Sequence, residues 1–248
     1  MTLRQAELKY YLRSPIIWLI LAFTAFISAW SFLLSIDVFT TLQVKFAGMS
    51  DAPTITGGII IPMLFAQSKI LIIIVSILAG LSFARLSENN SWFLITSSQL
   101  SEWGIIYQKY SALLIITLIF IMPTILALTC LSLITGVQFV PVALAILGLL
   151  LLLMWMSALA MLVSSFVNNS GFSILLCLFV LLFLWVLSQS AVESEWGKNW
   201  LQALTPFYHF KKFSSDYISV SSVFYFLMGT GINLWLVKIR LIQKRYVL

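Results

Sequence analysis

Six long apolar runs separated by short polar stretches make up most of the chain. They cover residues 15–35, 70–86, 105–135, 142–167, 172–189 and 223–237. A helix rises about 1.5 Å per residue, so about 20 apolar residues cross the hydrocarbon core of a bilayer. Inside lipid the backbone must form its own hydrogen bonds, which helices do. The pattern therefore predicts an all-α integral membrane protein with six transmembrane helices in a single domain, residues 1–248.

Lys69 determines where we place the start of the second span. A lysine at the bilayer centre costs about 2.5–3.5 kcal/mol, so we expect it at a boundary. Residues 57–67 then stand outside the span, and they are too short and too interrupted by Gly57, Gly58 and Pro62 to cross separately. We predict an outer interfacial or re-entrant segment there.

Composition excludes a water-soluble globule, because 61% of the residues are hydrophobic and only 9% are charged. Soluble domains carry about 25% charged residues. The net charge is +6, and the basic residues lie at span ends, where they face anionic lipid rather than nucleic acid. With the N-terminus in the cytoplasm, nine Lys and Arg residues lie on that side against five on the other. This bias predicts that both termini are cytoplasmic.

The polar segment 85–103 between the second and third spans is then cytoplasmic as well. It contains a short apolar turn, formed by Ser91, Trp92, Phe93, Leu94, Ile95, Thr96 and Ser97. Burial of each large apolar side chain in a partner's groove contributes about 1.5–3 kcal/mol before association costs. Such a turn can also lie in the lipid headgroup layer. Ser101 is a predicted helix cap, with Glu102 in the first turn of the next span.

Few residues offer catalytic chemistry. The sequence contains no glycine-rich phosphate loop, so we do not expect this chain to hydrolyse ATP or bind a cofactor. His209, the only histidine, lies in the outer loop 190–222 without a neighbouring metal ligand or nucleophile. It is either a hydrogen-bond anchor or a substrate contact. Gly229 and Gly231 in the last span favour close helix packing.

Three segments resemble the ABC-2 permease family, in particular its gliding-motility-type branch. Residues 7–20 read ELKYYLRSPIIWLI, and residues 81–110 read LSFARLSENNSWFLITSSQLSEWGIIYQKY. Residues 204–227 read LTPFYHFKKFSSDYISVSSVFYFL, with Pro206, His209 and Phe210 in the branch's spacing. The loop departs from the family pattern at Leu86–Ser87, Asn90–Ser91, Phe93 and Gln99.

The resemblance implies the permease subunit of an ATP-driven exporter in the bacterial inner membrane. A pair of separate ATPase subunits would bind the ATP, and a second permease copy or a paralogue would complete a dimer. Residues 91–97 with Glu102 look like the coupling helix that docks on the ATPase. Residues 1–13, with Arg4, Lys9 and Arg13, look like an interfacial helix beside it. Exporters of this family handle lipids, polysaccharides, peptides and other compounds.

Other classes fit the sequence less well. A secondary transporter or channel needs buried ionisable groups or an internal repeat, and the spans contain no mid-membrane carboxylate pair. A membrane-embedded enzyme needs more titratable groups together. A scaffold whose outer loop recruits an accessory membrane or periplasmic protein is compatible with transport.

Overall fold

The computed structural model describes residues 2–45, 54–89, 101–135, 139–190, 204–213 and 220–247. Nearly all of these residues are helical, and no strand occurs among them. The elements are α1 (Leu3–Arg13), α2 (Pro15–Lys45), the π-helical turn η1 (Thr56–Ile60), α3 (Ile61–Glu88), α5 (Glu102–Thr135), α6 (Phe139–Phe166), α7 (Ser170–Ser190), α9 (Pro206–Phe213) and α10 (Val220–Val247). The predicted all-α class is confirmed for this part of the chain.

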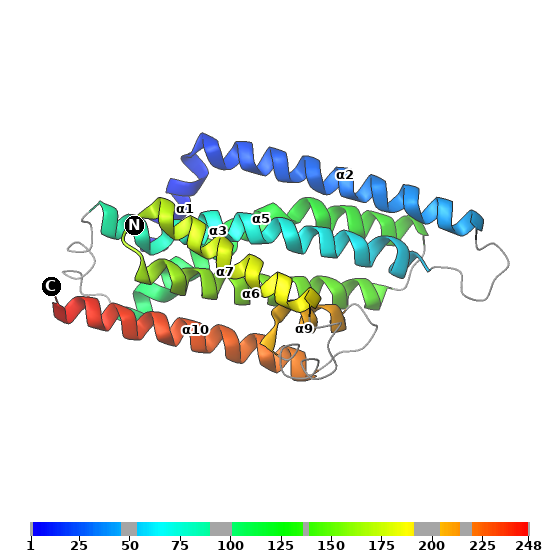
Figure 1. Ribbon diagram of the computed structural model, residues 1–248. Helices are drawn as coiled ribbons and strands as arrows, with labels where there is room; N and C mark the ends of the chain where they lie inside the picture. Colours follow the sequence, from blue (N-terminus) through cyan, green and yellow to red (C-terminus); the bar gives the residue numbers. More distant parts are fainter. Residues whose placement is uncertain are drawn as a thin grey trace.

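Six helices in the described residues are long and apolar enough to cross a membrane: α2, α3 together with η1, α5, α6, α7 and α10. The prediction of a multi-pass membrane protein with six spans is confirmed at this level of length and composition. The long helices run side by side, and both termini lie at the same end of the bundle (Figure 1). We call this the termini end; α9 lies toward the opposite end.

The second span differs from its predicted bounds. Helix α3 begins at Ile61, eight residues before Lys69, and η1 leads directly into it. Residues 57–67 therefore belong to the continuous helix formed by η1 and α3 rather than to a separate outer segment. Pro62 is the second residue of α3, directly after the π-helical turn η1. Lys69 is exposed, and its Nζ lies 5.5 Å from the centroid of the Trp185 ring in α7, so this charge does not have to end the helix.

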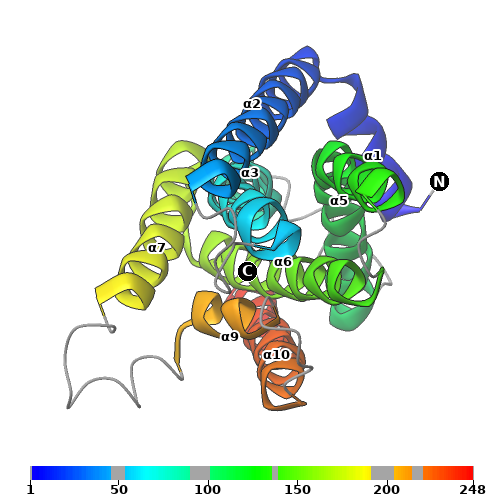
Figure 2. The ribbon, with the colours of Figure 1, turned by 90° about the vertical axis from the view of Figure 1, so that its right-hand side faces the viewer.

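Helices α3 and α6 occupy the middle of the bundle, with α7 on one side and α5 on the other (Figure 2). Small residues allow the close approach. A Cβ at Gly80 would lie 3.0 Å from the Ile174 backbone in α7. A Cβ at Gly148 of α6 would lie 2.7 Å from Phe213 of α9. Close backbone contact of this kind holds helices together where lipid removes the hydrophobic driving force.

Two buried polar groups also link the helices. Gln67 of α3 accepts hydrogen bonds at its Oε1 from Ser28 of α2 at 2.8 Å and from Thr124 of α5 at 2.9 Å. Ser164 of α6 donates to the Gly80 carbonyl of α3 at 2.9 Å. Each such bond contributes about 0.6 kcal/mol on average in a membrane protein. Together they fix α2, α5 and α6 against the central α3.

The outer face of α2 carries large apolar side chains that nothing in the described chain covers. Ile16, Leu19, Phe23, Phe26 and Trp30 are all more than half exposed. Such a surface is stable in lipid and would be unstable in water. It agrees with the assignment of α2 as a membrane span.

Candidate functional site

Helix α1 is a separate short helix at the termini end. Thr2 caps it: the Thr2 hydroxyl accepts from the Gln5 N–H at 3.4 Å, and the Gln5 side chain accepts from the Thr2 N–H at 3.1 Å. It ends at Ser14, and Pro15 begins α2 in a new direction. Helix α1 thereby lies beside α5 (Figure 2). The predicted N-terminal helix is confirmed as a helix; its place at a membrane surface stays a prediction.

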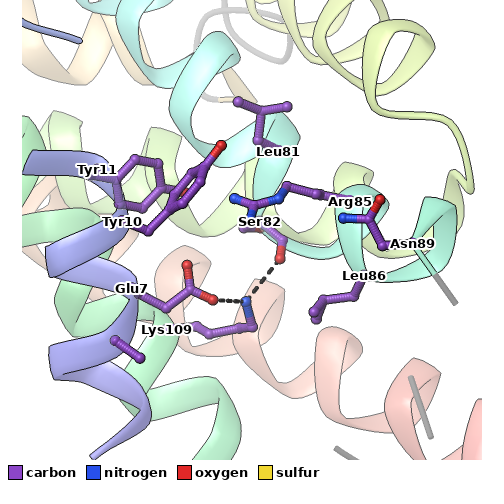
Figure 3. A pocket seen from close by; sticks show the side chains of 10 residues that line it. Glu7, Tyr10, Tyr11, Leu81, Ser82, Arg85, Leu86, Asn89 and Lys109 are labelled. Carbon is purple, nitrogen blue, oxygen red and sulfur yellow. Dashed lines mark hydrogen bonds and ion pairs between the residues drawn. The ribbon is translucent and has the colours of Figure 1, made fainter. Parts of the chain in front are cut away.

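An ion pair fastens α1 to the bundle. Lys109 of α5 is only 4% exposed, and its Nζ donates to the Glu7 carboxylate of α1 and to the Ser82 carbonyl of α3 at 2.9 Å (Figure 3). A buried ammonium group is costly unless it is paired and hydrogen bonded. These two acceptors provide that, so one side chain joins α1, α3 and α5.

Tyr11 makes a second attachment from the same face of α1, one helical turn beyond Glu7. Its hydroxyl donates to the Leu78 carbonyl of α3 at 3.1 Å. Burial raises the pKa of Tyr11 well above its usual range, and the nearby Glu7 carboxylate adds to the rise. The phenol therefore keeps its proton, and this hydrogen bond persists at every physiological pH.

A cavity of about 210 Å³ lies between α1 and α3 beside these attachments. Arg85 extends from α3 toward Tyr10 across this space (Figure 3), and its Cζ lies 3.5 Å from the centroid of the Tyr10 ring. Glu7, Asn89 and Lys109 also line the cavity. A cation stacked on an aromatic face in this way is held in a fixed orientation.

The C-terminal part of α10 forms polar contacts with the end of α3 and the start of α5. Arg245 donates from Nη1 to Oε1 of Glu102 at 2.7 Å, at the start of α5. Lys244 donates to the Ser87 hydroxyl of α3 at 3.2 Å. Glu88 accepts at 3.2 Å from the backbone N–H at the start of α7. Both ends of the undescribed segment 90–100 are thus attached to neighbouring helices.

The predicted coupling residues fall partly in this region. Ser91, Trp92, Phe93, Leu94, Ile95, Thr96 and Ser97 lie outside the described residues. Glu102 stands in the first turn of α5 as predicted, and the Ser101 hydroxyl caps this helix by accepting from the Gly104 N–H at 3.2 Å. Arg4, Lys9 and Arg13 project from α1 with exposed side chains.

The predicted outer-loop residues form a separate group toward the opposite end. Pro206, His209 and Phe210 are all buried in α9. Nδ1 of His209 lies 3.0 Å from the Ser222 hydroxyl, and the imidazole stacks on Tyr225 with 4.1 Å between ring centroids. These are the contacts of a hydrogen-bond anchor between α9 and α10. Substrate contact by His209 stays a prediction.

Sequence reasoning missed the connection between Glu7, Tyr11 and Lys109. Lys109 was placed among the cytoplasmic charges, and Lys109 and Glu7 were used only as parts of the segments that resemble the ABC-2 family. One signal was present: Glu7 and Tyr11 are four residues apart, so they share a face of a short helix. That face was expected to pack against another part of the chain. Which helix it contacts depends on how the chain turns at Ser14.

The described residues contain no group of three or more His, Cys, Asp and Glu side chains that could hold a metal ion. Comparisons of the chain with protein-family models and with the curated proteins gave no match. A functional assignment therefore depends on the sequence motifs and on the geometry of the termini end.

Proposed function

We propose that this chain is the membrane-spanning subunit of an ATP-driven ABC transporter of the ABC-2 permease type, acting as an exporter in the bacterial inner membrane. It pairs with a second copy or with a paralogue. Two separate ATPase subunits bind and hydrolyse the ATP. The segment 91–97 docks on an ATPase and receives the motion of its closure.

The observation that carries this proposal is the set of hydrogen bonds and ion pairs made by the residues on either side of that segment. Helix α3 ends at Glu88, and α5 begins at Glu102. The Glu88 carboxylate accepts a hydrogen bond from the start of α7, and the Glu102 carboxylate accepts one from Arg245 of α10. Lys109 links α5 to α1 and α3 within two turns of Glu102. A force applied to residues 91–97 therefore reaches five helices, α1, α3, α5, α7 and α10, through polar contacts. This is the mechanical requirement for coupling a motor to a helical bundle.

The charge distribution in the spans supports an external energy source. Among the described spanning helices, Asp37 is exposed, and Glu88 and Glu102 stand at helix ends. A proton-driven transporter needs carboxylates or histidines inside the bundle that exchange protons. The described spanning helices bury no carboxylate; their buried lysine, Lys109, is held by Glu7 and Ser82, and buried His209 belongs to α9, outside the spans. This arrangement favours an ATPase partner over a proton gradient.

A double substitution in the proposed coupling segment tests the assignment. We expect Trp92→Ala with Phe93→Ala to weaken the ATPase complex at least about tenfold, because each lost contact is worth about 1.5–3 kcal/mol. The measurements are the amount of ATPase that co-purifies with the chain and the ATP turnover of the purified complex. The matched control, Trp235→Ala with Phe224→Ala, removes the same residue types from the exposed face of α10.

The control should keep both the ATPase and its turnover, and both variants should insert in the membrane as the wild type does. Full retention of ATPase binding and turnover in the Trp92/Phe93 variant would contradict the coupling role. Transport of solute by the isolated chain, with no ATPase present, would contradict the whole proposal.

A further inference from the structure

The cavity between α1 and α3 has an uncommon charge arrangement. Its lining contains two cations, Arg85 and Lys109, and one carboxylate, Glu7. Because Lys109 pairs with Glu7, no carboxylate of the described lining is left for Arg85. Among the described residues, no carboxylate forms an ion pair with Arg85. The cavity therefore presents a net positive charge on a group already oriented by Tyr10.

A second hollow adjoins this cavity and is more basic. It is lined by Lys9, Arg13 and Ser14, and it shares Ala6 and Tyr10 with the first cavity. The two hollows together contain four cations and one carboxylate. A phosphate group is the natural ligand of such a surface, because a guanidinium forms paired hydrogen bonds to two phosphate oxygens.

A small apolar hollow lies on another face of α1 and shares no lining residue with the two basic hollows. Leu12, beside Arg13 in the chain, lines it together with Trp18 and Leu21 of α2 and with Ile116 and Phe120 of α5. Trp18 is half exposed, and its indole N–H donates to the Leu12 carbonyl at 2.8 Å. Tryptophan in this position is typical of the boundary between headgroups and hydrocarbon. Trp18 follows Arg13 by five residues, so the basic hollows lie at the level of the lipid headgroups.

We propose that the two basic hollows beside α1 and α3 bind an anionic membrane lipid. Arg85 holds its phosphate with help from Lys9 and Arg13, and the acyl chains of the lipid stay in the bilayer. This inference does not depend on the proposed transport function, since it needs only the geometry of α1 against the bundle. A lipid seated there would contact α1 and α3 together.

The test measures lipid retained by the full-length chain. The protein is placed in nanodiscs of phosphatidylglycerol and phosphatidylcholine with matched acyl chains, extracted, and analysed by native mass spectrometry. We expect wild type to retain phosphatidylglycerol preferentially and Arg85→Gln to reduce that retention about fivefold, which is the usual effect of one basic residue near an anionic surface. Arg85→Lys, which keeps the charge but loses the paired hydrogen bonds, should give an intermediate value.

Lys45→Gln is the matched control, because Lys45 is an exposed cation at the far end of α2. It should retain phosphatidylglycerol as wild type does. If Arg85→Gln is not monodisperse, the double variant Lys9→Gln with Arg13→Gln replaces it, since both side chains are exposed. The double variant must also lower the retention of phosphatidylglycerol.

Three results would overturn the proposal. The first is wild-type retention of phosphatidylglycerol in the Arg85→Gln or Lys9/Arg13 variant. The second is an equal loss in Lys45→Gln, which would show only a general effect of charge. The third is displacement of the lipid by glycerol phosphate at an equal concentration, which would identify a site for a soluble phosphate instead.

Discussion

Lys109 carries a full charge in a position that is almost completely buried. It tolerates burial because the Glu7 carboxylate and the Ser82 carbonyl accept its hydrogens. Removal of one member of such a pair costs more than the pair itself contributes, since an uncompensated charge remains. The stability of the α1 attachment is therefore most sensitive to Glu7.

We predict that Glu7→Ala lowers the stability of the α1 attachment by about 3 kcal/mol, because Lys109 stays buried with only the Ser82 carbonyl. Limited proteolysis in detergent should release α1 faster, and the melting temperature should fall. Asp37→Ala removes an exposed carboxylate at the opposite end of α2 and should leave both measurements within about 0.5 kcal/mol of wild type. Equal effects of the two substitutions would contradict the pairing.

The Tyr11 hydroxyl gives a second prediction at the residue scale. Tyr11→Phe should cost about 1 kcal/mol through loss of the bond to the Leu78 carbonyl. The folded protein raises the pKa of Tyr11, so this contribution is complete below the unfolded value of about 10 and declines as pH rises above it. Thermal unfolding of wild type and Tyr11→Phe between pH 7 and pH 11 measures how this stability difference changes with pH. Tyr10→Phe, with an exposed ring, should match wild type; the same pH response in both variants would contradict the assignment.

The contacts between individual side chains were the feature hardest to predict from the sequence. Lys109 was recognisable as a charge near a span end, and Glu7 and Tyr11 as neighbours on one face of a helix. Their meeting depends on the change of direction at Ser14 and on the packing of α1 beside α5. Neither follows from hydrophobic periodicity, because α1 has only a modest apolar stripe.

At the scale of helices, close approach between α6 and α10 occurs at one glycine of a pair. A Cβ at Gly229 would lie 2.2 Å from the indole nitrogen of Trp155, whereas a Cβ at Gly231 would meet nothing within 4 Å. The Trp155 ring cannot move freely, because it stacks against Tyr225. The sequence prediction of close packing is therefore confirmed for Gly229 and not for Gly231.

We expect Gly229→Ala to destabilise the protein by about 1–3 kcal/mol, because the added methyl group forces Trp155 out of its position. Gly231→Ala, two residues away in the same helix, should be neutral or stabilising by up to about 1 kcal/mol, since alanine favours helix over glycine. Thermal unfolding of the two variants in one detergent compares them directly. Similar melting temperatures would show that α6 and α10 pack differently from the structure.

The sequence predicted the number of spanning helices well and their starting points less well. The apolar runs identify each span, but α3 extends eight residues beyond Lys69 toward the N-terminus. The error came from the expectation that a lysine and a proline mark a boundary. Pro62 instead stands in the first helical turn, and Lys69 projects outward near Trp185.

For the whole molecule, an even number of spans brings both termini to one end of the bundle (Figure 1). That end also holds the contacts that join α1, α3, α5, α7 and α10. The sequence contains the positive charges that orient this end, but it does not show which helix ends are linked. A motor that acts on residues 91–97 requires such links.

Site-specific photo-crosslinking from position 92 in living cells tests the central claim most directly. A photoreactive residue replaces Trp92, and another replaces Trp235 on the exposed face of α10 as a control. We predict that position 92 crosslinks to a polypeptide carrying the phosphate-binding loop of an ATPase, and that position 235 does not. Crosslinks from position 92 to lipid alone, or labelling of that position by a reagent confined to the outside of the cell, would contradict the account.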